Sequence, residues 1–383
     1  MLQVIERMDD PLFVEAHIAD IHFGAIDAYT QFKILDEQFI SYINDMNVLD
    51  IISINGDLFD HKFMANSYAV AYATYFIQKL ADICRRKRCT LILISGTGSH
   101  DNDQLKLFIP LSSDPSVDIR IIFETQFIYV RGKKILVIPE QYGMGEEYYN
   151  KYLQYSGFYD ACYMHGTFVG AVPMMNERDL NSNREPVFDI MDFSSCYGPI
   201  ISGHVHVSDV YKNDFYYCGS PIRYSYGEEQ DKGFLILLHN IQTHKYQIHF
   251  EPIYSFRYDT VNMDDLLQGD PNDIIQYISK LQSEGIDHIR VKFTVNDAGK
   301  IALLRQYYRN NGTVKIASPN VEEIRVKREL EELDDKYKSY NYLFNDNLSP
   351  LDKLVQFMNA NPNNDIMWTT QSLQAFIDDI KNL

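Results

Sequence analysis

Residues 49–60 read LDIISINGDLFD, a short apolar run that ends in glycine and two carboxylates. Its length and its isoleucines are typical of a buried strand, and Gly56-Asp57 marks where the strand ends. Two similar runs are FVEAHIAD (13–20) and TLILISG (90–96), and helical patterns over about 29–46 and 67–88 separate the three. Strands that alternate with helices predict β-α-β units in a mostly parallel sheet.

Beyond this point the strands follow one another without long helices between them. The further strand patterns are FIYVRGKKILVIP (127–139), DACYMHG (160–166), GPIISGHVH (198–206), SDVYKNDFYYCGSP and GFLILLHN. RGKK and KNDF are typical of hairpin turns between strands. We therefore predict that residues 1–252 form one layered α/β domain.

After Pro252 the pattern changes to strand, helix, strand, helix and strand, which predicts a small α+β capping domain over residues 253–320. The last part, 321–383, begins with the charged run VEEIRVKRELEELDDKYKSY and continues into two amphipathic helical patterns. One apolar face carries Leu351, Leu354, Val355 and Met358, and the other carries Leu373, Phe376, Ile377 and Ile380.

Helices as short as these two are marginally stable alone, so their apolar faces must be buried. Two alternatives remain open: the faces dock on the chain's own small domain, or they bind a partner. Ser349 and Pro350 are expected to begin the first of the two helices.

Composition limits the classes of protein that the chain can belong to. No run approaches the roughly 18 apolar residues of a membrane span, and the start MLQVIERMDDPLF is not typical of a signal peptide, so a cytoplasmic protein is expected. Five irregularly spaced cysteines predict buried thiols rather than a disulfide framework. The net charge of −18 speaks against binding nucleic acid by bulk electrostatic attraction, although two bound divalent ions would add local positive charge.

Aspartate and histidine recur at the carboxyl ends of the predicted strands. They are Asp20, His22, Asp57, His100, Asp101, His165, His204 and His206. In an open α/β sheet this edge is where ligand sites form. Carboxylate and imidazole ligands together suit Mn, Fe or Zn, and their number is sufficient for two metal ions.

The remaining histidines lack such neighbours and are interpreted as structural or surface residues. They are His17, His61, His239, His244, His249 and His288. Asp60 is intermediate, because it can hold a turn or support a ligand histidine.

The order D-x-H, G-D-x-x-D, G-x-x-S-H-D, H-G and G-H-x-H over about residues 12–250 resembles the calcineurin-like metallophosphoesterase superfamily. GDLFD (56–60), the segment 217–221 (YCGSP) and the order of phosphoesterase, small cap and helical tail resemble the SbcD-like DNA repair nucleases. Those nucleases are the catalytic partners of SbcC-like coiled-coil ATPases. The resemblance implies a layered α/β metallophosphoesterase domain.

The resemblance also implies roles for the candidate residues. One metal ion would be held by Asp20, His22, Asp57 and His206, and the other by Asp57, His165 and His204, with Asp57 bridging them. His100 would lie beside the scissile phosphate and either protonate the leaving oxygen or stabilise charge there, with Asp101 orienting it.

The third motif departs from the family pattern. Asparagine ordinarily precedes the catalytic histidine and binds the second metal, whereas Ser99 precedes His100 here and two extra residues follow Gly96. A serine hydroxyl is a poorer ligand, so the second ion is expected to bind more weakly or to be held partly by water or backbone.

The function that the resemblance implies is a manganese-dependent DNA exonuclease and endonuclease. It would act as a homodimer and bind an SbcC-like ATPase through the C-terminal helices. Arg223 is a candidate for contacting the DNA backbone, and other local cations are Arg85, Arg86, Arg88, Lys133 and Lys134, although the arginines at 85–88 also suit a helix C-terminus. The alternatives are a small-molecule phosphatase or cyclic-nucleotide phosphodiesterase, and a catalytically impaired scaffold that binds a partner.

Overall fold

The structure is a computed structural model of the chain. It describes residues 11–101, 103–144, 146–154, 157–168, 187–211, 215–228, 230–294, 297–317, 349–360, 367 and 369–381.

The predicted parallel sheet is the first of two six-stranded sheets in the N-terminal unit. Its strand order is β14-β13-β1-β2-β3-β4, with bounds Leu12–Ile18 (β1), Ile51–Asn55 (β2), Thr90–Ile94 (β3), Asp118–Ile122 (β4), Gly233–Asn240 (β13) and Lys245–Pro252 (β14). Strands β1 to β4 are parallel, and β13 and β14 add an antiparallel edge. The three apolar runs that predicted strands are confirmed.

The predicted helices lie between these strands. Helix α1 (Ala28–Leu35) continues through a π-helical turn (Asp36–Ile40) into α2 (Ser41–Asp45), and α3 spans Tyr68–Lys87. Asp27 and Ser67 cap α1 and α3, because their side chains accept hydrogen bonds from the backbone N of Thr30 and Val70 at 2.9 and 3.2 Å. Side chains of β2 alternate between the helices and the other sheet: Ile52 and Ile54 pack with α1 and α3, and Ile51 faces the second sheet.

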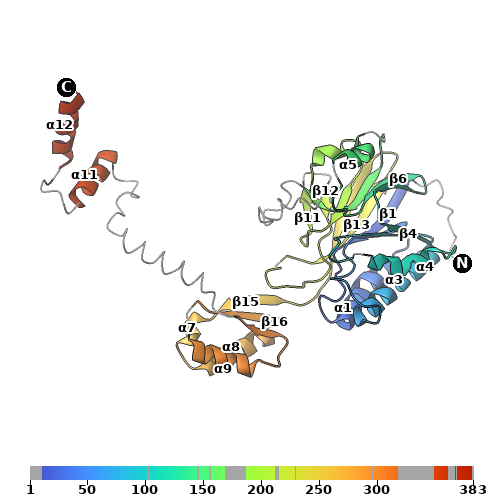
Figure 1. The fold of residues 1–383 in the computed structure, drawn as a ribbon, viewed down its shortest axis with the longest axis horizontal. Helices are drawn as coiled ribbons and strands as arrows, with labels where there is room; N and C mark the ends of the chain where they lie inside the picture. The colour runs from blue at the N-terminus through green and yellow to red at the C-terminus, as the bar shows by residue number, and fades with distance from the viewer. Residues whose placement is uncertain are drawn as a thin grey trace. The chain divides into compact units, whose positions relative to one another are not determined.

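The second sheet packs against the other face of the first. Its strand order is β11-β12-β10-β7-β6-β5, with bounds Gln126–Val130 (β5), Lys133–Ile138 (β6), Ala161–His165 (β7), Ile200–Gly203 (β10), Asp209–Tyr211 (β11) and Phe215–Tyr217 (β12). Tyr149 and Leu153 of α5 (Glu146–Leu153) cover its outer face, so Figure 1 shows two sheets between α5 on one side and α1 and α3 on the other. This is the predicted layered α/β fold.

Hairpins and short elements complete this unit. Arg131-Gly132, with φ of 47° and 89°, forms the predicted turn between the antiparallel strands β5 and β6. Strands β11 and β12 are also antiparallel, but residues 212–214 of the predicted KNDF turn lie outside the described residues. The short elements are η2 (Gln104–Phe108), α4 (Ile109–Ser112), β8 (Thr167–Phe168), β9 (Val187–Phe188) and η3 (Ile190–Phe193).

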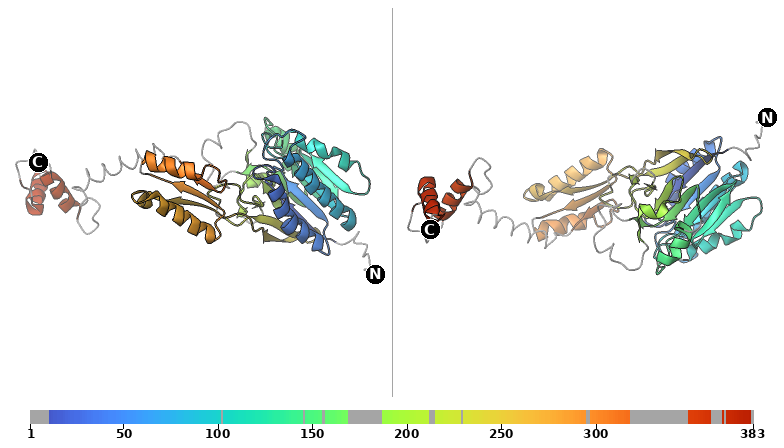
Figure 2. Two further views of the ribbon diagram at one scale, coloured as in Figure 1. Left: turned by 90° about the horizontal axis from the view of Figure 1, so that it is seen from below. Right: turned by 90° about the horizontal axis from the view of Figure 1, so that it is seen from above.

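The chain divides into two compact units, residues 1–259 with 284–288, and 260–283 with 289–383. The region after Pro252 has the predicted alternation: β15 (Tyr258–Asn262), α7 (Asp264–Leu267), α8 (Pro271–Ser283), β16 (His288–Lys292), α9 (Ala298–Tyr307) and β17 (Val314–Ile316). The strand order is β15-β16-β17, and α8 and α9 lie on one face of this small sheet (Figures 1 and 2). Buried Ile274, Ile289 and Leu304 form part of its core.

The two predicted C-terminal helices are α11 (Pro350–Ala360) and α12 (Thr370–Lys381), and they pack against each other. Ser349 caps α11 as expected, because its hydroxyl accepts a hydrogen bond from the backbone N of Asp352 at 3.1 Å. Asp352 in turn accepts from the hydroxyl of Thr370 at 2.7 Å, and Val355 and Leu373 are buried. Parts of the two apolar faces therefore pack against each other. We had expected them to pack on the chain's own small domain or on a partner. The charged run before them lies outside the described residues.

None of the helices in the described part of the chain has the length and apolarity needed to cross a membrane. Each of the five cysteines, all within the described residues, is a free thiol, and four of them are buried as expected.

Charged and polar side chains form a buried cluster between the two sheets. Glu15 and His17 of β1, Lys133 of β6, Tyr163 of β7 and His239 of β13 all have no exposed surface. Lys133 pairs with Glu15 and donates a hydrogen bond to the Tyr163 hydroxyl at 2.8 Å, and His17 Nε2 lies 3.3 Å from Glu15. His17 and His239 are therefore structural, as predicted, whereas Lys133 cannot serve as a surface cation.

This cluster predicts that stability falls in mild acid. Burial lowers the pKa of His17, and burial beside Lys133 lowers that of His239 to about 3. Below a pH of about 6.5 the unfolded chain binds protons that the folded chain excludes, so unfolding is favoured by up to about 1.4 kcal/mol per pH unit for each histidine. We expect the Tm to drop steadily between pH 6.5 and 4.5, measured by circular dichroism. His239→Leu should flatten that slope, and an unchanged slope would contradict the assignment.

Candidate metal centre

The predicted ligands come together where strands of both sheets end. Asp20 and His22 follow β1, Asp57 follows β2, His165 ends β7, and His204 and His206 follow β10. Their ligand atoms form overlapping groups within 4.8 Å. The groups are Asp20, His22 and His206; Asp20, Asp57 and His165; Glu140, His165 and His204; and His22, Asp60 and His100.

The first group brings two imidazoles against a buried carboxylate. Nε2 of His22 lies 3.0 Å from Nε2 of His206. The carboxylate of Asp20 has no exposed surface and accepts hydrogen bonds from the backbone N of His204 at 3.0 and 3.1 Å. Two imidazole nitrogens that face each other this closely suit a shared cation.

A second group lies around Asp57 and consists of Asp57, Glu140, His165 and His204. Nε2 of His165 lies 3.4 Å from Asp57 Oδ2 and 3.5 Å from Glu140 Oε2, and Nδ1 of His204 lies 3.2 Å from the same Glu140 oxygen. The other ring nitrogen of His165, Nδ1, donates to the backbone carbonyl of Asn55 at 2.8 Å, which fixes the ring with Nε2 directed inward.

These separations fit metal coordination. Ligand atoms that share one ion at about 2.1 Å, with angles between tetrahedral and octahedral, lie about 3.0–3.4 Å from one another. The shortest distances are close to that range: 3.0 Å between His22 and His206 in the first group, and 3.2 to 3.5 Å from His165 and His204 to the two carboxylates. The other ligand atoms of the first group lie within 4.8 Å of one another. Oε1 of Glu140 and Nδ1 of His22 are buried and have no hydrogen-bond partner among the described residues, which is costly unless another group is bound. The donor set therefore fits divalent metal ions.

Backbone strain is concentrated in the same residues. Asp20, His22, Asp57 and His204 have φ of 51°, 49°, 50° and 86°, in the left-handed region that side chains other than glycine rarely adopt. Each such residue costs on the order of 1 kcal/mol, and strain of this kind persists where function requires it. A Cβ on Gly96 would lie 2.2 Å from Asp57 Oδ1, so only glycine lets this loop approach the carboxylate.

The electrostatics show a site that attracts positive charge. Burial lowers the pKa of His22 to about 4, so its imidazole is neutral and able to bind a metal at pH 7. Burial would also lower the pKa of His165, but Asp57 outweighs it and raises that pKa well above the usual value. At His204 burial is likewise outweighed, here by the hydrogen bond with Glu140, so the pKa is raised. Three buried carboxylates, Asp20, Asp57 and Glu140, are the source of this negative potential.

His100 lies at the rim of the first group. Its ring centroid is 4.7 Å from that of His22, and its Nδ1 donates to the backbone carbonyl of Asp60. Asp101 accepts hydrogen bonds from the backbone N of Phe59 and of Gly96 at 3.1 and 2.9 Å. Burial raises the pKa of Asp101 to about 7. The structure thus places Asp101 as a brace between two site loops, and the Asp60 carbonyl orients His100.

The structure does not bring Ser99 into either group, because its side chain is exposed. Two residues earlier, the Thr97 hydroxyl lies 3.1 Å from Asp57 Oδ2 and 3.2 Å from Glu140 Oε2. Thr97 and Glu140 were both missed. Glu140 follows β6, which is parallel to β7, so the rule that sites form at carboxyl ends of strands could have found it.

The predicted backbone-binding cations are engaged elsewhere. Nε and a terminal nitrogen of the Arg223 guanidinium donate to the carbonyls of Glu228 and Gln230 at 2.9 and 3.0 Å. Arg85 pairs with Asp82 and Asp114, and the Lys134 amine lies over the ring of Phe127. These three cations therefore have partners of their own, whereas the amine of Lys232 lies at the site and donates to the backbone carbonyl of His206 at 2.7 Å.

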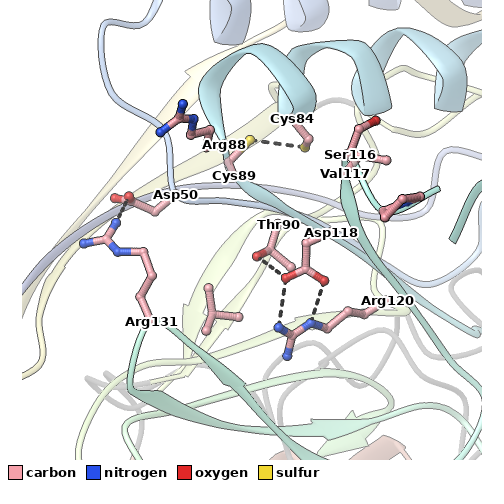
Figure 3. A pocket seen from close by; sticks show the side chains of 12 residues that line it. Asp50, Cys84, Arg88, Cys89, Thr90, Ser116, Val117, Asp118, Arg120 and Arg131 are labelled. Atoms are coloured by element: carbon pink, nitrogen blue, oxygen red, sulfur yellow. Dashed lines mark hydrogen bonds and ion pairs between the residues drawn. The ribbon is translucent and has the colours of Figure 1, made fainter. Parts of the chain in front are cut away.

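A pocket of about 480 Å³ lies at the opposite edge of the first sheet, where β2, β3 and β4 begin. Figure 3 shows Arg131 reaching Asp50, Arg120 paired with Asp118, and the sulfurs of Cys84 and Cys89 facing each other. Its acidic residues are each paired with an arginine. This pocket therefore holds no chemistry comparable to the metal centre.

Comparison with known proteins adds little to this geometry. No protein-family model and no curated protein matches the chain. Solved structures do match, and one of them, a crystal structure, covers 63% of this chain and 100% of its own, with 13% identity and a TM-score of 0.36. A likeness at that level carries no argument about function. The residues themselves show a layered α/β fold in which buried aspartates and histidines form candidate metal sites.

Proposed function

We propose that the chain is a two-metal phosphodiesterase that hydrolyses DNA. The observation that carries the two-metal site is the position of the Asp57 carboxylate. Its Oδ2 lies 3.8 Å from Nε2 of His22 in the first group and 3.4 Å from Nε2 of His165 in the second. One carboxylate therefore faces the ligands of both groups, as a bridging ligand must.

The residues present define how the site would work. Asp20, His22, Asp57 and His206 would hold one ion, and Asp57, His165 and His204 the other. Two divalent ions, for which the mixed oxygen and nitrogen ligands suggest manganese, supply Lewis-acid activation and charge neutralisation to phosphodiester hydrolysis. His100 donates from Nδ1 to a backbone carbonyl, so Nε2 is the atom that can give a proton to the leaving oxygen.

DNA is favoured as the substrate by the resemblance to DNA repair nucleases and by the architecture. A minimal phosphoesterase needs neither the small α+β sheet of β15, β16 and β17 nor the helices α11 and α12. The exposed tyrosines Tyr29, Tyr68 and Tyr75 on α1 and α3 support the proposed homodimer, because large exposed apolar side chains that gather on one surface mark interfaces.

A small-molecule phosphatase or cyclic-nucleotide phosphodiesterase is the second candidate. One observation favours it: Lys133 is buried against Glu15, and Arg85 and Arg223 are engaged in contacts of their own. Together with the net charge of −18, these contacts leave few cations to guide a DNA backbone. The scaffold alternative is less well supported, because the six predicted Asp and His ligands lie in groups whose ligand atoms are within 4.8 Å of one another.

Hydrolysis assays distinguish the two enzymes. End-labelled linear DNA and bis-p-nitrophenyl phosphate are incubated with the full chain in Mn²⁺, in Mg²⁺ and in chelator. Cleavage of DNA that needs the metal supports the nuclease. Hydrolysis of the small diester without cleavage of single-stranded or duplex DNA would favour the second candidate.

The helical tail gives a prediction about the proposed ATPase partner. Leu354 of α11 and Met367 remain exposed although α11 and α12 pack together, which leaves apolar surface for a partner. Deleting residues 346–383 is expected to leave metal binding intact and to abolish association with a coiled-coil ATPase subunit in co-sedimentation. Association that survives the deletion would remove the tail from the interface.

A further inference from the structure

Glu140 has a position that its sequence neighbours do not explain. It follows β6, is 7% exposed, and has its backbone N bonded to the carbonyl of Ser95 at 3.2 Å. Its Oε2 lies 3.2 Å from Nδ1 of His204, 3.5 Å from Nε2 of His165 and 3.2 Å from the hydroxyl of Thr97. One carboxylate oxygen thus lies 3.2 to 3.5 Å from side-chain atoms of His204, His165 and Thr97, close to the separation of atoms that share one ion.

The other oxygen of Glu140 makes the arrangement unusual. Oε1 is buried and has no hydrogen-bond partner among the described residues. A carboxylate serving only to hold the two histidines would be expected to satisfy its second oxygen by a backbone or side-chain donor. A bound cation would satisfy it, because a metal ion can take one or both oxygens of a carboxylate.

The second cluster also lacks the oxygen ligand that the family's third motif supplies. Where an asparagine amide is expected after Gly96, this chain has Thr97, and Ser99 is exposed. Threonine offers a neutral hydroxyl, which is a weak metal ligand. Glu140 reaches the same cluster from a different strand, and it brings a full negative charge rather than an amide dipole.

We propose that Glu140 is the oxygen ligand of the second metal ion and replaces the missing asparagine. This inference rests on the proposed two-metal site. The second group then consists of Asp57, Glu140, His165 and His204, with Thr97 donating its hydroxyl hydrogen bond to Asp57 or Glu140.

The substitution changes the charge of the centre. Asp20, Asp57 and Glu140 contribute three negative charges, where the ligand set implied by the resemblance contributes two from Asp20 and Asp57. An additional carboxylate favours hard, oxygen-preferring ions such as Mn²⁺ and Mg²⁺ over Zn²⁺ at the second position. With Glu140 as a ligand, the second ion is predicted to be held tightly, whereas Ser99 alone led to the expectation of weaker binding or of an ion held partly by water or backbone.

Metal-binding stoichiometry tests this assignment without relying on activity. The metal-free full chain is titrated with Mn²⁺ by equilibrium dialysis and isothermal titration calorimetry. We expect two ions per wild-type chain and, in Glu140→Ala, one tight ion and a second bound at least about tenfold more weakly. Glu140→Gln keeps an oxygen at the same place without the charge, so its second ion should fall between the two.

The control is Glu124→Ala, which removes an exposed glutamate near the start of β5 and should bind two ions like the wild type. Thermal melts of the metal-free variants report whether each one folds. If Glu140→Ala fails to fold, the Mn²⁺ titration of Glu140→Gln tests the proposal, because its side chain has the shape of the native one. Preference for Mn²⁺ over Zn²⁺ at the weaker site should decline in both variants.

The outcomes separate this inference from the proposed function. Two equally tight ions in both Glu140 variants would overturn the ligand role and leave the two-metal enzyme standing. A wild-type chain that binds no Mn²⁺ would instead overturn the proposed function itself, and the ligand assignment with it.

Discussion

Asp57→Ala is expected to abolish tight binding of both metal ions and to lower phosphodiester hydrolysis on the order of 10³-fold or more, the loss of several kcal/mol of charge stabilisation. The reason is geometric. Asp57 Oδ2 faces His22 in one group and His165 in the other, so its removal takes a ligand from each ion. The measurements are Mn²⁺ stoichiometry by calorimetry and kcat on bis-p-nitrophenyl phosphate.

Two further variants control for folding and for charge. In the wild-type chain Asp57 accepts a hydrogen bond from the backbone N of Thr97 at 2.6 Å. Asp57→Asn keeps the side-chain shape and an oxygen that can accept this bond, but it removes the negative charge. Asp45→Ala removes an exposed carboxylate at the end of α2 and should change neither quantity. Full activity with two bound ions in Asp57→Ala would exclude Asp57 as a bridging ligand.

His100→Ala is expected to lower kcat by about 10² to 10⁴, the usual range for general acid catalysis, while both metal ions stay bound. His100 Nδ1 donates to the Asp60 carbonyl, which leaves Nε2 free to protonate a leaving oxygen. The effect should be large for DNA, whose leaving alkoxide needs a proton. It should be small for p-nitrophenyl esters, because a nitrophenolate leaves without protonation.

The dependence on the leaving group decides between an acid and a metal ligand. His100 also belongs to a group with His22 and Asp60 that could hold an ion, and a ligand role would lower the stoichiometry and slow both substrates equally. His61→Ala is the matched control, since this exposed histidine contacts Asp60 at 2.8 Å but belongs to none of the ligand groups. Equal losses for DNA and for the nitrophenyl ester would exclude His100 as the acid.

The sequence alone predicted those features that depend on residues close together along the chain. The runs that became β1, β2 and β3 are mostly apolar because both faces of the sheet are covered, by helices on one side and by the second sheet on the other. Ser349 begins α11 as predicted, because a short polar side chain reaches backbone N–H groups within its own turn. Asp27 and Ser67 cap α1 and α3 in the same way, although no cap was predicted for these two helices.

The candidate metal ligands were also predictable from the sequence. Asp20, His22, Asp57, His165, His204 and His206 all stand at the ends of strands, and parallel strands deliver their carboxyl ends to one edge. Periodicity and strand order suffice for that inference. The backbone strain at four site residues was not visible, because φ depends on how the loops pack.

Other features were decided by tertiary structure. Glu140 stands after a parallel strand, where a ligand can be expected, but its contact with Thr97 arises only because the two sheets pack face to face, which no spacing along the chain shows. Lys133 appears in the sequence as a turn cation, but the packing of β6 against β1 buries it on Glu15. The sequence was thus sufficient to predict the candidate ligands that stand at the ends of strands. Contacts between charges on separate strands were decided by the tertiary structure. A buried charge is costly unless it is paired, and only the packing of the two sheets brings the partners together.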